Sequence, residues 1–255
     1  MLWYMQNGLQ LNPDKSETPV IGTSNQLQAA SSSLTTISVA GVDLPTAEHM
    51  KVLGVTLDRR LSFDQHVSAV ARSCNFHAQA IRHIRPLLTR DLAATLTCSL
   101  ILSRLDYCNA ILHGAPVGCI RKRQRVQNNA AKIVCQASRR SHARPLLREL
   151  HWLPVVQRID YKVATLTYKV WQTSTPAYLS QHITDRTTTR NLRSSSAPTL
   201  VQPFCRTTFA NRAFRSRNSA ETGKFRGLAQ NSVVHGKLWY LLIITHSSQE
   251  IIMQS

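Results

Sequence analysis

Basic side chains crowd one predicted helix, and they offer the clearest chemistry in the sequence. The helix is expected over about residues 117–137, and its charged positions are Arg121, Lys122, Arg123, Arg125 and Lys132. Lysine and arginine release counterions when they bind phosphates, which makes such binding salt-sensitive and largely independent of sequence. We therefore predict that these five residues contact nucleic acid; the competing interpretation is a solvated helix face.

The composition of the whole chain supports a polyanionic partner. Of its 255 residues, 31 are Lys or Arg and 13 are Asp or Glu, so the formal net charge is +18. Such a surplus favours nucleic acid or, less commonly, a membrane surface. The apolar runs are too short for a signal peptide or for the roughly 20 residues of a membrane span, so we expect no membrane attachment.

Pairs of carboxylates offer weaker candidates for chemistry. Asp58 with Asp64 straddles a change from strand to helix, and Asp91 with Asp106 lies about four helical turns apart. Asp91 is more simply explained as a helix-start residue. The residues alone therefore predict no catalytic carboxylate.

Cysteines and histidines also form no convincing site. Cys74 with His77 and His83 has a histidine spacing that does not fit one helical face, and Cys108 with His113 lacks a third, orienting group. We predict no metal site. The six cysteines show no paired short spacing, which favours a reducing intracellular compartment, the nucleus or the cytoplasm.

A small β region is predicted before the helices. Residues 34–44 and 51–57 are rich in apolar and β-branched side chains and are expected to form an antiparallel pair, with a further short strand at Val20 and Ile21. Residues 26–33 are mostly Gln, Ala and Ser without an apolar period, and they are predicted to form a loop.

Helical patterns begin at Ser62, a predicted cap to which Gln65 reaches back. The first helix is expected to stop near Pro86, Thr89 to cap a second that runs to Gly114, and residues 155–170 to form the clearest amphipathic helix. Apolar positions expected on one helix face are Val67, Ala71, Cys74, Ala78 and Ile81 in the first helix, and Val155, Ile159, Val163, Leu166 and Val170 in the last.

These elements predict an α+β fold that is mainly α. A small antiparallel sheet at the N-terminal end precedes a helical, basic, bundle-like region, and a poorly ordered tail follows, because no sustained period continues beyond about residue 215. The expected regions are 1–61, 62–185 and a basic tail, 186–255.

Six strings along the chain carry a family resemblance. They are residues 3–17, 53–58 (Leu-Gly-Val-Thr-Leu-Asp), 103–110 (Ser-Arg-Leu-Asp-Tyr-Cys-Asn-Ala), 125–131 (Arg-Val-Gln-Asn-Asn-Ala-Ala), 150–155 (Leu-His-Trp-Leu-Pro-Val) and 166–169 (Leu-Thr-Tyr-Lys). In this order they are similar to the C-terminal part of the reverse transcriptases (RNA-directed DNA polymerases) of non-LTR, LINE-type retrotransposons, the chicken-repeat-1 and jockey-like elements. The resemblance covers roughly residues 3–214.

That resemblance implies roles for particular residues. Lys15 corresponds to a lysine that lies near the incoming nucleotide, and Leu53, Gly54 and Val55 correspond to the strand of the primer grip. The helices after Ser62 correspond to the thumb, which holds the template and primer. The implied partner is RNA or an RNA–DNA duplex.

The chain departs from the family pattern in its catalytic centre. In the family, the aspartates that bind two magnesium ions lie on a turn upstream of the segment that matches Trp3 onward. That aspartate-bearing turn is not present in this sequence. We therefore expect a truncated transposable-element fragment that retains nucleic-acid binding, uses no cofactor and is not an enzyme on its own. The family pattern also stops at Phe214, which suggests a shifted frame or a different exon beyond it.

Two alternatives stay open. The chain could be a helical protein-interaction module that uses the Val155 to Val170 stripe. It could also be an open reading frame without a selected function.

Overall fold

A computed structural model describes residues 6–7, 12, 16, 18–31, 36–39, 42–185, 200–201, 204–206, 210 and 213–214. The chain divides into two units, Met1–Ile159 and Asp160–Ser255, and the division falls inside helix α8. The fold is α+β and mainly helical, which confirms the predicted class. The three predicted regions stay predictions, and most of the predicted tail lies outside the described residues.

Two small sheets replace the single antiparallel pair that the sequence predicted. Strand β3 (Val42–Ala47) pairs with β1 (Thr18–Pro19) in parallel and with β2 (Thr36–Val39) antiparallel. Strands β4 (His49–Val52) and β5 (Val55–Asp58) form their own antiparallel pair, with Lys51 opposite Thr56. The predicted pairing of residues 34–44 with 51–57 is therefore wrong.

The turn between β4 and β5 explains this difference. Leu53 and Gly54 have φ angles of 45° and 79°, and they lie between the paired residues Val52 and Val55. Two consecutive positive φ values match the twist of two-residue hairpin turns, in which glycine is favoured. The segment predicted as one strand thus folds back on itself at its glycine.

Helix α2 (Ser24–Ser31) occupies most of the segment that the sequence predicted as a loop. A reciprocal cap explains its start, because the Thr23 amide donates to Gln26 Oε1 at 2.9 Å while the Gln26 amide lies 3.5 Å from Thr23 Oγ1. The loop prediction is wrong because this cap starts a helix in a segment that lacks an apolar period.

Helix α3 (Asp64–Ile84) begins in a different way from the prediction. Its N-cap is Phe63, with φ 61° and no capping side chain, and Ser62 instead bonds to Asp58. The predicted core face is confirmed: Val67, Ala71, Cys74, Ala78 and Ile81 are all buried.

The second predicted helix is shorter than expected and interrupted. Thr89 accepts a hydrogen bond from the Leu92 amide, as predicted, at the start of α4 (Arg90–Thr97). A π-helical turn, η3 (Cys98–Leu102), and α5 (Ser103–Asp106) continue it. The helix ends there because Tyr107 has ψ 123° and Cys108 is left-handed with φ 48°, and a 3₁₀ turn, η4 (Asn109–Leu112), follows.

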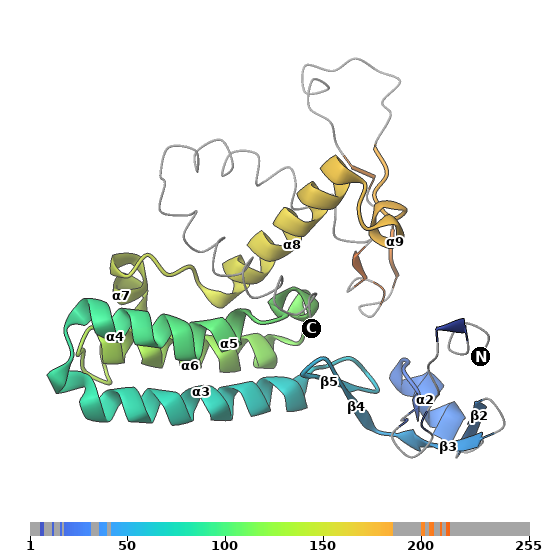
Figure 1. Ribbon diagram of the computed structural model, residues 1–255, viewed down its shortest axis with the longest axis horizontal. Coiled ribbons are helices and arrows are strands. Elements are labelled where there is room, and N and C mark those ends of the chain that lie inside the picture. The colour runs from blue at the N-terminus through green and yellow to red at the C-terminus, as the bar shows by residue number, and fades with distance from the viewer. Residues whose placement is uncertain are drawn as a thin grey trace. The chain divides into compact units, whose positions relative to one another are not determined.

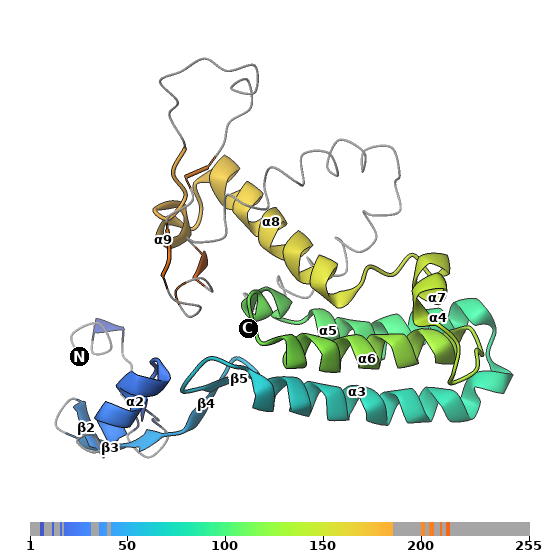
Figure 2. The same cartoon turned by 180° about the vertical axis from the view of Figure 1, so that it is seen from behind.

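Helices α3, α4, α5 and α6 (Val117–Val134) build the helical bundle, with α7 (Ala143–Glu149) and the first turns of α8 (Val155–Thr173) packed on it. Two buried clusters form its core. The larger includes Ile101, Leu105, Ala130, Val134 and Trp152, and the smaller includes Val55, Val67, Leu112, Val155 and Ile159. Helices α3 and α6 lie side by side in both views (Figures 1 and 2).

The second unit holds the rest of α8 and the short helix α9 (Ala177–Ser180). The Trp171 indole N–H donates to Asp185 at 2.9 Å, which ties α8 to the segment after α9. Asp185 also forms an isolated antiparallel bridge with Leu200.

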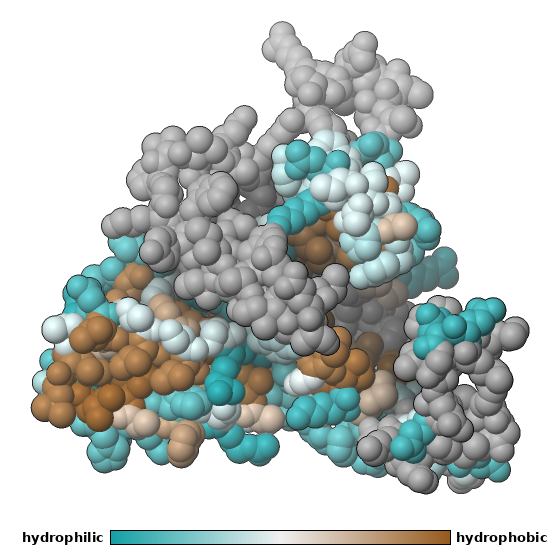
Figure 3. Space-filling model, viewed as in Figure 1, coloured by the Kyte–Doolittle hydropathy of each residue, from teal (hydrophilic) through white to brown (hydrophobic). Residues whose placement is uncertain are grey.

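An apolar surface covers the end of the bundle where α3 gives way to α4 (Figure 3). Ile84, Leu87 and Leu92 are exposed in this segment, and Leu87 exposes 86% of its surface. None of the helices in the described part of the chain is long and apolar enough to cross a membrane.

Candidate nucleic-acid interface

A polar groove of about 840 Å³ lies between the C-terminal halves of α3 and α6. None of its described lining residues carries a carboxylate, and none is aromatic. Its lining residues are Asn75, Gln79, Arg82, Arg85, Pro86, Arg125, Asn128, Asn129, Lys132, Ile133, Gln136, Ala137 and Arg139. We call this feature the basic groove.

Helical periodicity places these side chains along two facing edges. On α3, Asn75, Gln79 and Arg82 recur at steps of four and three, and they flank the buried face. On α6, Arg125 and Lys132 lie seven residues apart on one face in the same way. The two helices run in the same direction, with Lys122 near Asp64 at one end and Asn129 near Arg82 toward the other, so the two edges face each other.

A side-chain hydrogen bond joins α3 and α6 across the basic groove. Arg82 Nη2 donates to Asn129 Oδ1 at 2.9 Å. This contact joins the two edges and holds the guanidinium, which is otherwise exposed, over the groove.

Buried Arg85 closes one end of the basic groove. Its guanidinium donates to the backbone carbonyls of Ile133 and Val134, at 3.1 Å from Nε to each, and to that of Leu88 at 2.7 Å. The last carbonyls of a helix lack partners within the helix and carry partial negative charge. Arg85 therefore acts as a cationic cap for the C-terminus of α6.

The five basic residues predicted on α6 lie in four different settings. Arg125 and Lys132 line the basic groove, and Lys132 Nζ also donates to the Arg139 carbonyl at 2.7 Å. Arg121 is exposed on α6 but is not among the lining residues, and Lys122 lies 3.1 Å from Asp64 in an ion pair.

Arg123 corrects the sequence interpretation. Its side chain is fully buried, at 0% exposure, and donates to the Leu105 carbonyl at 2.8 Å. Arg123 thus occupies the core face of α6, where it cannot meet a phosphate backbone. Charge alone suggested an exposed role, but its helical position relative to Val126 and Ala130 places it inward.

Several groove residues were not predicted from the sequence. Asn75, Gln79 and Arg82 lie on α3, and no excess of charge marks that helix. The signal that was available is their spacing on the edge of the predicted core face. Only the packing of α3 on α6 makes that edge part of a groove.

The three residues assigned to a primer-grip-like strand lie at the tip of the β4–β5 hairpin and beside it. Leu53 exposes 79% of its surface, whereas Val55 is buried. The Tyr107 hydroxyl donates to the Leu53 carbonyl at 2.7 Å and fastens the tip to the segment after α5. Lys15, the remaining predicted contact, lies outside the described residues.

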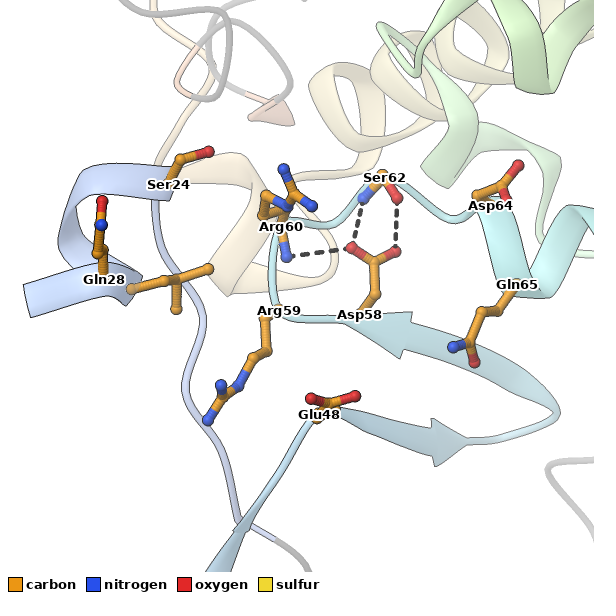
Figure 4. A pocket seen from close by; sticks show the side chains of 10 residues that line it. Ser24, Gln28, Glu48, Asp58, Arg59, Arg60, Ser62, Asp64 and Gln65 are labelled. Carbon is orange, nitrogen blue, oxygen red and sulfur yellow. Dashed lines mark hydrogen bonds between the residues drawn. The ribbon is translucent and has the colours of Figure 1, made fainter. Parts of the chain in front are cut away.

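A second pocket, of about 490 Å³, surrounds the end of β5 (Figure 4). Asp58 lies in it, and its two oxygens accept hydrogen bonds from the amides of Arg60, Ser62 and Phe63 and from the Ser62 hydroxyl. Partial burial alone would raise the pKa of Asp58, but the hydrogen bonds from Ser62 and Phe63 outweigh it and lower that pKa. Asp58 thus organises the entry to α3.

The cysteines and histidines considered above as metal ligands or as a nucleophile with its base do not gather into a metal site in the described residues. Among the described residues, no group of three or more His, Cys, Asp or Glu side chains could hold a metal ion. Burial raises the pKa of Cys74 to about 11. Cys108 is exposed, whereas His113 is buried.

Three strings of the family resemblance meet where α5, α6 and the start of α8 come together. Asp106 accepts hydrogen bonds from Arg158 and, at 3.3 Å, from Asn109. Gln127 Nε2 donates to the Leu153 carbonyl at 2.8 Å. These contacts join distant segments, so the polar residues of these strings hold the fold together.

Comparisons with known proteins bear on the origin of the chain. No family model matches it, and no solved structure matches it significantly. It is similar to a probable RNA-directed DNA polymerase from transposon BS of Drosophila melanogaster, with 34% identity over 94 residues, 37% of this chain. The matched stretch covers 10% of that relative's length. This similarity supports a reverse-transcriptase-related origin for the chain.

Proposed function

We propose that the basic groove binds the sugar-phosphate backbone of RNA or an RNA–DNA duplex. The observation that carries the proposal is a groove whose described lining combines arginine, lysine and side-chain amides without a carboxylate. Phosphates accept hydrogen bonds and carry negative charge, so such a lining complements them. The net charge of +18 adds long-range attraction.

The lining also favours tolerance of sequence. Proteins that hold splayed single-stranded bases stack them on aromatic side chains, and the described lining has none. Binding should therefore depend on the backbone and on salt rather than on base identity.

A reverse-transcriptase-related origin gives this groove a biological context. We propose that the chain derives from the primer-grip and thumb region of a LINE-type element. The order of the matched strings supports this subtype, and the similarity to the transposon BS polymerase supports a reverse-transcriptase-related origin.

We assign binding, not polymerisation, to this chain on its own. Asp58 is held by four hydrogen bonds, and Asp106 is paired with Arg158, so both carboxylates serve the fold. Primer extension by the purified chain with magnesium or manganese tests the assignment, and nucleotide incorporation would contradict it.

The apolar stripe of α8 does not favour the protein-interaction alternative. Val155, Ile159, Val163 and Val170 are buried and Leu166 is half-buried, so little of the stripe is available to a partner.

Gel-shift titration with a labelled RNA–DNA duplex tests the groove. Replacing Arg125 and Lys132 together by Glu should weaken binding by at least about tenfold, because it places two negative charges among the phosphates. In the corresponding double alanine variant, the slope of log K against log salt should fall by roughly 0.7–0.9 per lost contact.

A matched control makes the same change in net charge elsewhere. Arg144 and Arg148 are exposed on α7 and are not among the lining residues of the groove. Their double Glu variant should bind much better than the groove variant. Equal loss in both variants, or affinity that ignores salt, would overturn the proposal.

A further inference from the structure

A chain of side-chain amides runs from the segment before α8 to the basic groove. Gln124 Oε1 accepts from the Val155 amide at 2.8 Å. Gln124 Nε2 donates to Gln127 Oε1 at 2.9 Å and to Asn128 Oδ1 at 2.8 Å. Gln127 Nε2 in turn donates to the Leu153 carbonyl at 2.8 Å.

The direction of every hydrogen bond in this chain is determined by its two backbone ends. A backbone N–H can only donate and a carbonyl can only accept, whereas an amide side chain has one oxygen and one NH₂ group. The Val155 amide therefore requires the oxygen of Gln124, and the Leu153 carbonyl requires the NH₂ group of Gln127. The NH₂ group of Gln124 therefore faces Asn128 and donates to it, so the Asn128 atom that accepts this hydrogen bond must be its oxygen.

Asn128 and Asn129 both use their side-chain oxygens in hydrogen bonds within the protein. The Asn128 oxygen is taken by Gln124, and the Asn129 oxygen is taken by Arg82, whose guanidinium has no acceptor. What each amide has left for a ligand is its NH₂ group. Both residues line the groove beside Arg125 and Lys132.

We propose that Gln124 is a positioning residue that fixes Asn128 as a hydrogen-bond donor to a phosphate of the bound backbone. A freely rotating asparagine would present its oxygen part of the time, and that oxygen repels phosphate, which only accepts. The part-buried relay disfavours this orientation, because it holds the Asn128 oxygen against the NH₂ group of Gln124. The inference rests on the proposed function. It explains how the basic groove favours ligand groups, such as phosphate, that only accept hydrogen bonds.

A double-mutant cycle on binding to an RNA–DNA duplex tests the coupling. Gln124→Met and Asn128→Ala should each raise Kd by about three- to tenfold, within the range expected for the loss of one typical hydrogen bond. The double variant should bind no worse than Asn128→Ala, because Gln124 acts through Asn128. The salt slope should stay at the wild-type value, since no cationic contact is lost.

Gln157→Met serves as the matched control, because it makes the same substitution outside the relay. Gln157 is exposed on α8 and is not among the residues that line the groove. Its replacement should leave both the melting temperature and Kd close to the wild-type values. Should Gln124→Met fail to fold by circular dichroism, Gln124→Glu keeps the oxygen that Val155 needs and replaces it in the cycle.

The outcomes are distinct for the two claims. A wild-type chain that shows no salt-dependent binding refutes the proposed function. Wild-type binding with an unchanged Kd for Gln124→Met, or with effects that add in the double variant, refutes the positioning role alone.

Discussion

Arg123 on α6 donates a hydrogen bond to the backbone carbonyl of Leu105, at the end of α5, at 2.8 Å. Its second terminal nitrogen lies 3.4 Å from His66 Nε2 on α3. One fully buried guanidinium thus links three helices of the bundle through a carbonyl and an imidazole. Burial lowers the pKa of Arg123, because desolvation penalises the charged form.

Truncation of Arg123 should damage stability rather than binding. Arg123→Ala leaves a cavity and an unpaired Leu105 carbonyl, so we expect a loss of about 2–4 kcal/mol in the free energy of unfolding. Urea unfolding followed by circular dichroism measures it. Arg121→Ala, on the exposed side of the same helix, should change that free energy by less than about 0.5 kcal/mol. A reduced salt slope for folded Arg123→Ala would contradict its assignment to the core.

His66 should make the bundle less stable in mild acid. Burial, and then the neighbouring charge of Arg123, lower the pKa of His66 below its usual 6.5. The unfolded chain therefore binds a proton more readily than the folded one, and the free energy of unfolding should fall as pH drops below about 6.5 toward the folded pKa.

Urea titrations between about pH 7.5 and about pH 5 measure this dependence. His66→Gln retains a group that can accept from Arg123 but does not titrate, so its pH dependence should be flatter. His77→Gln on the same helix serves as the control. Equal slopes in wild type and His66→Gln would show that other groups cause the effect.

Removal of the Arg85 cap should loosen the end of α6. Arg85→Met leaves the carbonyls of Ile133 and Val134 without their cationic partner, and we expect a cost of about 2–3 kcal/mol. Hydrogen exchange should rise first in the last turn of α6. The exposed Arg82→Met variant should cost less; a larger cost there would contradict the capping role of Arg85.

The hairpin tip allows structure and function to be separated. Leu53 is left-handed and exposed, so Leu53→Asn should stabilise the protein by about 0.5–1 kcal/mol, whereas Gly54→Ala should destabilise it by about 1 kcal/mol. Thermal unfolding measures both changes. If Leu53 positions a primer as the family resemblance implies, duplex affinity falls in Leu53→Asn although stability rises. Unchanged affinity would argue against that role.

Local sequence determined the helices and their buried faces. The spacing of Val67, Ala71, Cys74, Ala78 and Ile81 alone assigns them to the core, because burial on a helix repeats with its period of 3.6 residues. Thr89 could be assigned as a cap for a similarly local reason: its partner is the nearby Leu92 amide. The fold class followed from these patterns.

The sequence could not show which of two possible helix caps forms when a capping side chain has another hydrogen-bond partner nearby. Both Ser62 with Gln65 and Thr23 with Gln26 have the spacing of a reciprocal cap, yet only the second pair forms it. Asp58 decides the difference, because its carboxylate engages the Ser62 amide and hydroxyl.

The basic groove itself was decided by the tertiary structure. Basic residues on α6 were visible in the sequence, but helical packing sends Arg123 inward and brings Arg125 and Lys132 opposite Arg82. The sequence determined how much positive charge each helix carries. Which charges face solvent together depends on contacts between α3 and α6, some fifty residues apart, and local propensity holds no information about them.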